Sequence, residues 1–190
     1  QLTPMPKGRL KPAPAVNLMN RHAATAIAVA LSGALLSAQP PKGITFTDIT
    51  APAGIAFTHE SGSAGQKYLP ETLGSGAAFF DADGDGWADL FLVNSKRWTP
   101  GPKRALSALY RNTGKGTFTN ITAGSGLDVE MYGMGVAAGD FDNDGRQDLY
   151  VTALEGDRLF HNDGAGKFKD VTKQAGIANA NFGTSAAWLD

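Results

Sequence analysis

Short apolar runs, separated by glycine, aspartate and other turn-forming residues, make up most of the chain from about residue 44 onward. Two of them, "DLFLVN" (89–94) and "DLYVTA" (148–153), are almost continuous in apolar side chains instead of alternating strictly. Continuous runs of this length are typical of strands that are covered on both faces. Helical periodicity is absent outside an apolar stretch near the N-terminus. The pattern therefore predicts an all-β fold.

The region between residues 135 and 172 predicts the order of strands in one structural unit. "GVAAG" (135–139) leads into an acidic loop, and "DLYVTAL" (148–154) leads out of it. "RLFHN" (158–162) and "KFKDVT" (167–172) then flank a turn that contains glycine, as the two strands of a β-hairpin do. We therefore expect a four-stranded antiparallel sheet.

Segments of this unit recur along the chain. Three aligned segments are "LGSGAAFFD" (73–81), "YGMGVAAGD" (132–140) and "FGTSAAWLD" (182–190), and two longer ones are "LYRNTGKGTFTNITAGSGL" (109–127) and "LFHNDGAGKFKDVTKQAGI" (159–177). The spacing between equivalent positions is 50 residues from Phe118 to Phe168 and 59 residues from Asp81 to Asp140. A period near 50 residues indicates the blades of a β-propeller or the units of a solenoid.

Aspartates are crowded into the loop between the first two strands of each unit. The loops share the spacing D-x-D-x-D-G-x-x-D, with Asp81, Asp83, Asp85 and Asp89 in the first and Asp140, Asp142, Asp144 and Asp148 in the second. Two like charges 4 Å apart repel each other by about 4 kcal/mol near a protein surface. A bound cation would remove this repulsion. An acidic, solvated turn is the alternative, but repetition of both the spacing and the flanks favours a metal site.

The rest of the loop pattern indicates which metal would bind. Glycine at position six permits a sharp turn, and the backbone carbonyls of Trp87 and Arg146 at position seven are expected to complete the shells. Asp190 would begin a third loop. All of these ligands are hard oxygens, which predicts Ca²⁺. An EF-hand is excluded because Leu92 and Val151 stand at position twelve, where it needs an acidic residue.

Two expectations follow for single residues of the loops. Asp89 and Asp148, at the loop exits, are expected to contribute most to calcium binding. Asp148→Ala is accordingly expected to lower stability only when calcium is present. Asn143 is expected to face outward, so that Asn143→Ala changes little.

Composition and the N-terminus bear on the compartment. The chain has no cysteine, which excludes disulfides and a thiolate metal site, and its formal net charge of −1 with no basic face gives no sign of nucleic-acid binding. Arg21, an apolar stretch of 14 residues (23–36) and the small residues Ser37 and Ala38 have the layout of a secretory signal peptide. This stretch is too short to span a membrane, although a buried core helix is an alternative. We expect an exported protein, periplasmic or extracellular, from a bacterial host.

The paired loops resemble the FG-GAP/VCBS repeats of integrin-α-type propellers. The segment "FTHESGSAGQKYLPETLGSGAAFFDADGDGWADLFLVN" (57–94) and the recurring "F-x-[DN]-[IV]-T-x-x-[AS]-G-[IL]" units resemble more specifically the cartilage acidic protein family, also called ASPIC/UnbV. The resemblance covers about residues 44–190. It implies a secreted, calcium-binding β-propeller of seven blades followed by a small further domain. Only the loop aspartates can be transferred position by position.

The repeats and the resemblance together predict the domain organisation. At about 50 residues per blade, seven blades need about 350 residues, so we expect an incomplete ring that forms the N-terminal part of a longer protein. The expected segments are an upstream stretch (1–18), the signal peptide (19–38), a linker with an outer closing strand at 46–50 (39–72), blade 1 (73–131), blade 2 (132–181) and the start of blade 3 (182–190).

The expected function is a binding or adhesion module for an extracellular protein or glycan. The alternative is the scaffold of a propeller enzyme, such as a polysaccharide lyase or a lipase. His59, Glu60 and Glu71 could form a general acid–base set, but the sequence pairs them with no nucleophile. No catalytic residue is therefore predicted, and enzymatic activity is not expected.

Overall fold

The computed structural model describes residues 43–99, 101–177 and 180–189. The expected signal peptide, the segment before it and Asp190 lie outside these residues. The chain divides into two units, Gln1–Thr47 and Asp48–Asp190, and the sheets and loops below all belong to the second. Among the described residues, no helix is long and apolar enough to cross a membrane.

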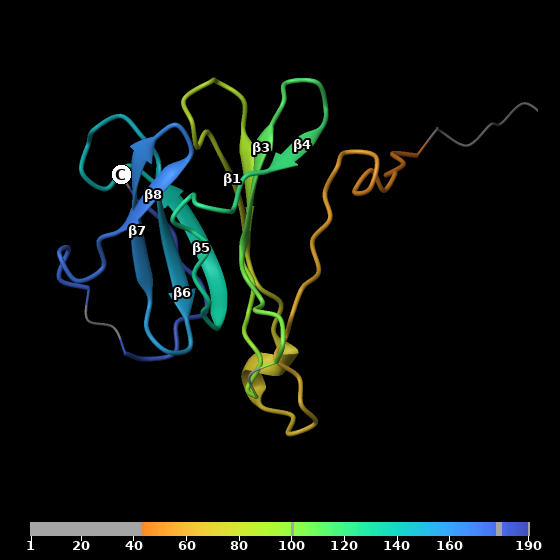
Figure 1. Cartoon of the computed structure of the whole chain (residues 1–190), viewed down its shortest axis with the longest axis vertical. Coiled ribbons are helices and arrows are strands. Elements are labelled where there is room, and N and C mark those ends of the chain that lie inside the picture. The colour runs from red at the N-terminus through yellow and green to blue at the C-terminus, as the bar shows by residue number, and fades with distance from the viewer. Residues whose placement is uncertain (1–42, 100, 178–179, 190) are drawn as a thin grey trace, which may run out of the picture. The chain divides into compact units, whose positions relative to one another are not determined.

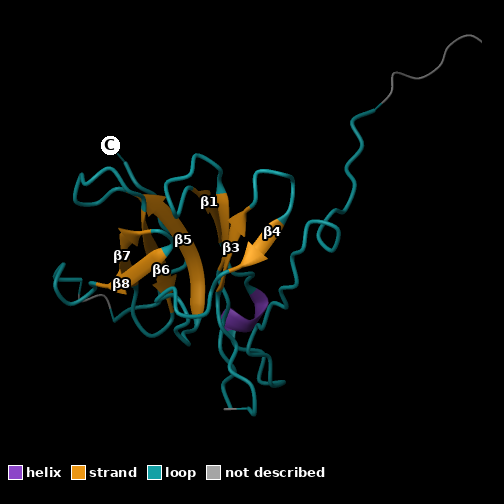
Figure 2. Cartoon of the chain, turned by 45° about the horizontal axis from the view of Figure 1, so that its top comes forward, coloured by secondary structure: helices purple, strands orange, loops and turns teal. Residues whose placement is uncertain are grey.

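Two four-stranded antiparallel sheets, each with its strands in sequence order, confirm the all-β prediction. Their arrangement is drawn in Figures 1 and 2. The first sheet consists of β1 (Ala77–Phe80), β2 (Asp89–Leu92), β3 (Ala108–Asn112) and β4 (Phe118–Asn120). The second consists of β5 (Gly133–Gly139), β6 (Asp148–Ala153), β7 (Arg158–Gly164) and β8 (Lys167–Asp170). The sole helical element in the described ranges is a 3₁₀ turn, η1 (Leu69–Thr72).

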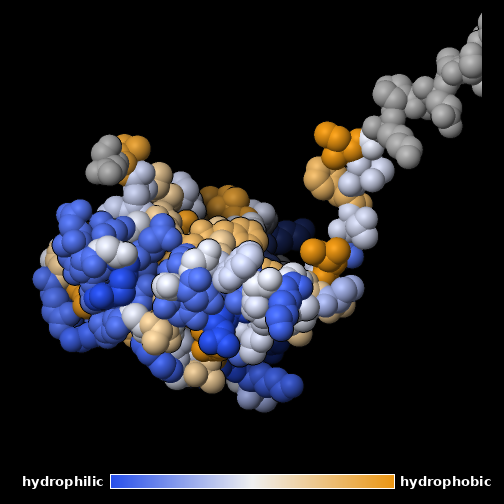
Figure 3. All heavy atoms as spheres, turned by 90° about the horizontal axis from the view of Figure 1, so that it is seen from above, coloured by the Kyte–Doolittle hydropathy of each residue, from blue (hydrophilic) through white to orange (hydrophobic). Residues whose placement is uncertain are grey.

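The strand register places the two acidic loops at equivalent points. In the first sheet Phe80 pairs with Asp89, and in the second Gly139 pairs with Asp148. Each loop therefore connects the ends of two paired strands, and its last aspartate is already part of the ladder. Both loops lie at the upper end of the sheets in Figure 1. Figure 3 looks onto this end, where hydrophilic and intermediate residues cover most of the visible surface.

Apolar side chains cover β2 on both faces, as its continuous pattern predicts. Phe91 belongs to a core that joins the two sheets and also contains Leu149 and Phe160. Leu90 faces the opposite way, into a smaller cluster with Tyr110. Burying a side chain of this size stabilises a fold by about 1.5–3 kcal/mol, so the contact between the sheets is a main source of stability.

A short turn docks each sheet on the segment before it. The carbonyl of Ala53 accepts a hydrogen bond of 2.7 Å from the backbone N–H of Phe118 in β4. The carbonyl of the aligned Ser125 accepts one of 2.7 Å from Phe168 in β8. The "T-x-x-[AS]-G-[IL]" motif is therefore a docking turn between successive units.

The expected outer strand at 46–50 is not observed. Residues 46–49 have no regular secondary structure, and residue 50 begins a turn. Phe46 and Ile49 are 94% and 60% exposed, respectively. The predicted partners of this stretch are strands of the last blade, which the described residues do not include, so the outer strand stays a prediction. Within the described residues, the turn itself forms contacts with the following sheet, while no neighbouring strand pairs with 46–50.

Candidate metal centre

The first loop curls around the carboxylate of Asp81. One oxygen of Asp81 accepts the backbone N–H groups of Gly84 at 2.8 Å and Asp85 at 3.2 Å, and the other accepts that of Gly86 at 2.9 Å. Asp81, Asp83 and Asp85 each offer one oxygen, and these three oxygens lie within 4.8 Å of one another. The alternating spacing therefore brings three carboxylates together, as predicted.

The second loop repeats two of these backbone hydrogen bonds but gathers a different set of carboxylates. Asp140 accepts the backbone N–H groups of Asp144 at 3.1 Å and Gly145 at 2.8 Å. Oxygens of Asp140, Asp142 and Asp148 lie within 4.8 Å of one another. Clusters of carboxylate oxygens at this separation are able to bind a metal ion, because a cation offsets the repulsion between them.

Backbone conformation explains two of the positions that are not aspartates. Gly86 and Gly145 at position six have φ angles of 85° and 88°, in the left-handed region that favours glycine. Position four is also left-handed, with φ of 82° at Gly84 and 60° at Asn143. Asn143 is exposed, as expected. However, alanine in this conformation costs about 1–2 kcal/mol, so Asn143→Ala is not the neutral change that the sequence predicted.

Asp89 and Asp148 are fully buried and link the loops to the sheets. Asp89 accepts the N–H of Ala82 at 2.9 Å and that of Asn112 at 2.7 Å, one on each oxygen. Asp148 likewise accepts the N–H of Phe141 at 3.0 Å and that of Asn162 at 2.7 Å, one on each oxygen. Each therefore closes its own loop and ties it to the third strand of its sheet.

Burial raises the pKa of Asp89 and of Asp148, although the backbone N–H groups that donate to each carboxylate oppose the rise. Neighbouring loop aspartates raise the pKa of both further, whereas His161 lowers that of Asp148. The charged forms are thus disfavoured where they stand, and a nearby cation would stabilise them. In this respect the donor set fits a bound metal ion.

The two residues at position seven differ in their surroundings. The N–H of Trp87 donates to Asp85 and that of Arg146 to Asp144, both at 2.9 Å. The Trp87 side chain is 54% exposed, whereas the Arg146 guanidinium forms an ion pair with Asp144.

Sequence reasoning missed three residues that brace the loops. The side-chain oxygen of Gln147 accepts the N–H of Asp81 at 3.3 Å, which connects the second loop to the first. The Asn162 amide donates to the carbonyls of Ala82 at 3.2 Å and Gln147 at 3.0 Å. Asn162 and its equivalent Asn112 stand at the same place in the aligned repeats. This repetition is the sequence signal that could have identified Asn162 as a residue that supports the loop. His161, described below, is the third missed residue. The aligned repeat does not have a histidine at this position, so the sequence contains no signal for it.

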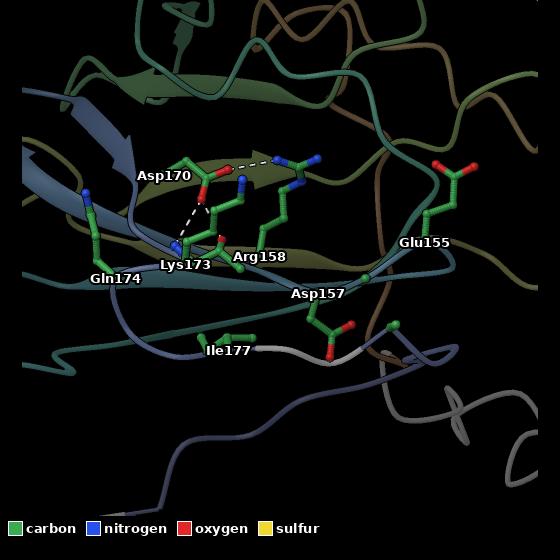
Figure 4. A pocket seen from close by; sticks show the side chains of 10 residues that line it. Glu155, Asp157, Arg158, Asp170, Lys173, Gln174 and Ile177 are labelled. Atoms are coloured by element: carbon green, nitrogen blue, oxygen red, sulfur yellow. Dashed lines mark hydrogen bonds and ion pairs between the residues drawn. The ribbon is translucent and has the colours of Figure 1, made fainter.

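A concave region away from the loops is built from paired charges. It has a volume of about 620 Å³ and is lined by residues 155–158, 170, 172–174, 177 and 180. Figure 4 shows Arg158 reaching Asp170, an ion pair of 2.8 Å. Asp157 accepts the Tyr150 hydroxyl at 2.9 Å, and burial, followed by this carboxylate, raises the Tyr150 pKa to about 12. Arg158, Asp170 and Asp157 therefore each have a partner within the protein.

Comparison with known proteins agrees with the fold and the loops. Residues 81–151 match the FG-GAP-like repeat family, and this range contains both acidic loops and the strands from β2 to β5. The chain thus carries an FG-GAP-like repeat, and its two sheets are consistent with blades of an FG-GAP propeller.

One relative is cartilage acidic protein 1 of Xenopus tropicalis. It is 35% identical over 92 residues, which cover 46% of this chain. The chain spans about 13% of the length of that protein. The similarity is therefore distant and partial, and it confirms the resemblance expected from the sequence.

Proposed function

We propose that this chain is part of an exported, calcium-binding repeat protein that acts as a binding module for extracellular glycans or proteins. The observation that carries the proposal is the pair of equivalent loops at one end of two successive sheets. Each loop gathers three carboxylate oxygens within 4.8 Å. Ca²⁺ prefers such oxygen ligands, and its binding would hold the loops in one conformation. A row of ordered loops is a surface to which a partner can bind.

The indole of Trp87 favours a glycan as the partner. It lies beside the first loop, and a Cβ atom added at Gly114 would come within 2.9 Å of its ring. The ring is therefore held against the β3–β4 turn while 54% of the residue remains exposed. A fixed aromatic face can pack against the apolar face of a sugar ring. Carboxylates and a cation next to it would bind hydroxyl groups.

A glycan array tests this proposal. Wild-type protein is expected to bind a subset of glycans in calcium and to lose binding in EGTA. Trp87→Ala should weaken binding at least tenfold while leaving calcium affinity unchanged. Phe79→Ala serves as the matched control, because Phe79 is another exposed aromatic residue, 66% exposed, that lies on β1 and outside the loop. Equal binding by Trp87→Ala and wild type would exclude the indole as the contact.

Calcium affinity is expected to fall when the pH is lowered from 7 to 5. Because burial raises the pKa of Asp89 and Asp148, protons compete with the cation at a higher pH than they would at ordinary aspartates. Calorimetric titration with Ca²⁺ at both pH values measures the change. An affinity that stays constant over this range would contradict competition by protons at these two carboxylates.

One contact favours the enzymatic alternative. His59 Nε2 lies 3.0 Å from the hydroxyl of Ser75, and a histidine beside a serine hydroxyl is the arrangement that activates a serine nucleophile. However, Ser75 also donates to the carbonyl of Gly133 at 3.0 Å and contacts Ser95 at 3.3 Å, so the hydroxyl has structural partners as well.

Labelling with a fluorophosphonate probe tests whether Ser75 is reactive. Labelling that disappears in Ser75→Ala and persists in Ser95→Ala would support hydrolase chemistry. Absence of labelling in the wild type would leave the binding module as the proposed function.

A further inference from the structure

His161 on β7 lies against the second acidic loop. Its Nε2 is 3.1 Å from an oxygen of Asp144 and 3.3 Å from an oxygen of Asp142. The imidazole is largely enclosed, with 18% of the side chain exposed. One nitrogen and two oxygens thus converge within 4.8 Å of one another. Two of these residues come from the loop and the third from a neighbouring strand.

The other ring nitrogen of His161 has its own carboxylate partner. Nδ1 lies 2.8 Å from an oxygen of Asp163. In metal sites, a carboxylate on one imidazole nitrogen fixes the tautomer and leaves the lone pair of the other nitrogen free for the metal. Here that other nitrogen is Nε2, which faces Asp142 and Asp144. Asp163 therefore holds the ring in an orientation suited to coordination.

The first loop lacks this arrangement. Arg111 stands at the position aligned with His161, and its guanidinium lies 3.8 Å from an oxygen of Asp83. Arginine remains protonated in proteins and has no lone pair to offer. The first unit therefore places a fixed positive charge beside its loop, whereas the second places a potential nitrogen ligand there.

We infer that the second loop carries an additional cation site, formed by His161 Nε2 and carboxylate oxygens of Asp142 and Asp144, that binds a transition cation such as Zn²⁺ or Co²⁺. This inference rests on the proposed metal-binding role of the loops. Imidazole nitrogen suits these cations, while Ca²⁺ takes oxygen ligands. Ligands about 2.0–2.1 Å from a tetrahedral Zn²⁺ are separated by roughly the distances seen between His161 and the two aspartates.

The site has three protein ligands and shares one of them with the calcium cluster. Asp142 belongs both to this group and to the group of Asp140, Asp142 and Asp148. Its two oxygens allow it to bridge two cations. Three protein ligands around Zn²⁺ leave the fourth position open to water.

Two cationic groups compete with a metal ion for these carboxylates. They are the guanidinium of Arg146 and the protonated imidazole of His161. The Arg146 guanidinium pairs with Asp144, and its Nε donates to the carbonyl of Asn162 at 2.7 Å. That second contact can persist if the guanidinium gives up Asp144 to a cation. In the competing arrangement, an imidazolium bridges Asp142 and Asp144 without a metal ion.

Titration with Co²⁺ in saturating Ca²⁺ distinguishes the two arrangements. The wild-type protein is expected to bind one Co²⁺ with the strong visible absorption of a tetrahedral site, and Zn²⁺ should displace it. His161→Arg, which reproduces the first loop, should weaken Co²⁺ binding at least tenfold. His59→Gln is the matched control and should bind Co²⁺ like the wild type. Calorimetry with Ca²⁺ on the same samples should show that all three proteins still bind Ca²⁺.

The titrations distinguish failure of the additional cation site from failure of the proposed function. Wild-type protein that binds Ca²⁺ but not Co²⁺ would overturn the additional site and leave the proposed function intact. Co²⁺ binding that survives unchanged in His161→Arg would also overturn it. If the wild type binds neither cation, both the additional site and the calcium-binding function are wrong.

Discussion

Gly126→Ala is expected to destabilise this protein by about 2–5 kcal/mol. The φ angle of Gly126 is +89°, and a Cβ atom there would lie 1.9 Å from the carbonyl oxygen of Phe168. The left-handed conformation costs alanine about 1–2 kcal/mol, and overpacking against the next sheet adds about 1–3 kcal/mol. Because the carbonyl belongs to the β8 backbone, it cannot move aside without disturbing the hairpin.

Gly176→Ala is the matched control for this contact. Gly176 occupies the same place in the third docking turn, with φ of +70°, but a Cβ atom there meets nothing within 4 Å. The free energy of unfolding of Gly176→Ala should therefore fall only by the cost of the left-handed conformation, about 1–2 kcal/mol. Gly54→Ala, whose Cβ would be 2.8 Å from the carbonyl oxygen of Phe118, should fall between the two. Urea denaturation of the three variants measures the differences, and equal losses would show that the turns do not dock the sheets.

Asp142→Ala is expected to lower the melting temperature in calcium and to leave it nearly unchanged in EGTA. At a calcium concentration about ten times the dissociation constant, one site stabilises the fold by about 1.4 kcal/mol. Asp142 is exposed, and its carboxylate lies 3.3 Å from His161 Nε2, so its removal leaves no buried group without a partner. Asn143→Gly is the control, because glycine accepts the left-handed conformation at that exposed position. A loss in EGTA as large as that in calcium would contradict metal binding by this loop.

Asp148→Ala is expected to lower stability in both conditions, which replaces the expectation drawn from the sequence. Asp148 is fully buried and accepts the N–H groups of Phe141 and Asn162. An unsatisfied buried donor costs about 1–3 kcal/mol, and removal of a disfavoured charge offsets part of this. A loss of stability in EGTA would therefore reflect the loss of these hydrogen bonds and would not contradict calcium binding. Thermal melts of both variants in both conditions separate the two roles.

The strands and loops could be predicted because their signals are local. The run "DLYVTA" is apolar enough to be buried on both faces, and β6 is formed by those six residues. The spacing of Asp81, Asp83 and Asp85 brings their oxygens together through turns within the loop itself. The same spacing recurs at Asp140, whose carboxylate accepts the backbone N–H groups of its loop as that of Asp81 does.

Local pattern was insufficient where a residue's role depends on another segment. The stretch 46–50 has the composition of the outer strands, but it forms no strand among the described residues, because a strand needs a partner and its expected partners belong to the last blade. Asn143 looked replaceable because only its backbone angle, a property of the folded loop, opposes alanine.

By itself, the sequence determined the all-β class, the four-stranded repeat and the crowding of carboxylates in two loops. These features depend on apolar periodicity and on spacings of a few residues, which the chain expresses wherever it folds. The tertiary structure alone decided that Asp148 closes its loop through two backbone N–H groups and that Asn162 reaches Ala82 in the other loop. It also decided that His161 faces Asp142 and Asp144. The contacts of Asp148 and His161 depend on the pairing of β6 with β7 within the second sheet, and the contact of Asn162 with Ala82 depends on the packing of one sheet against the other.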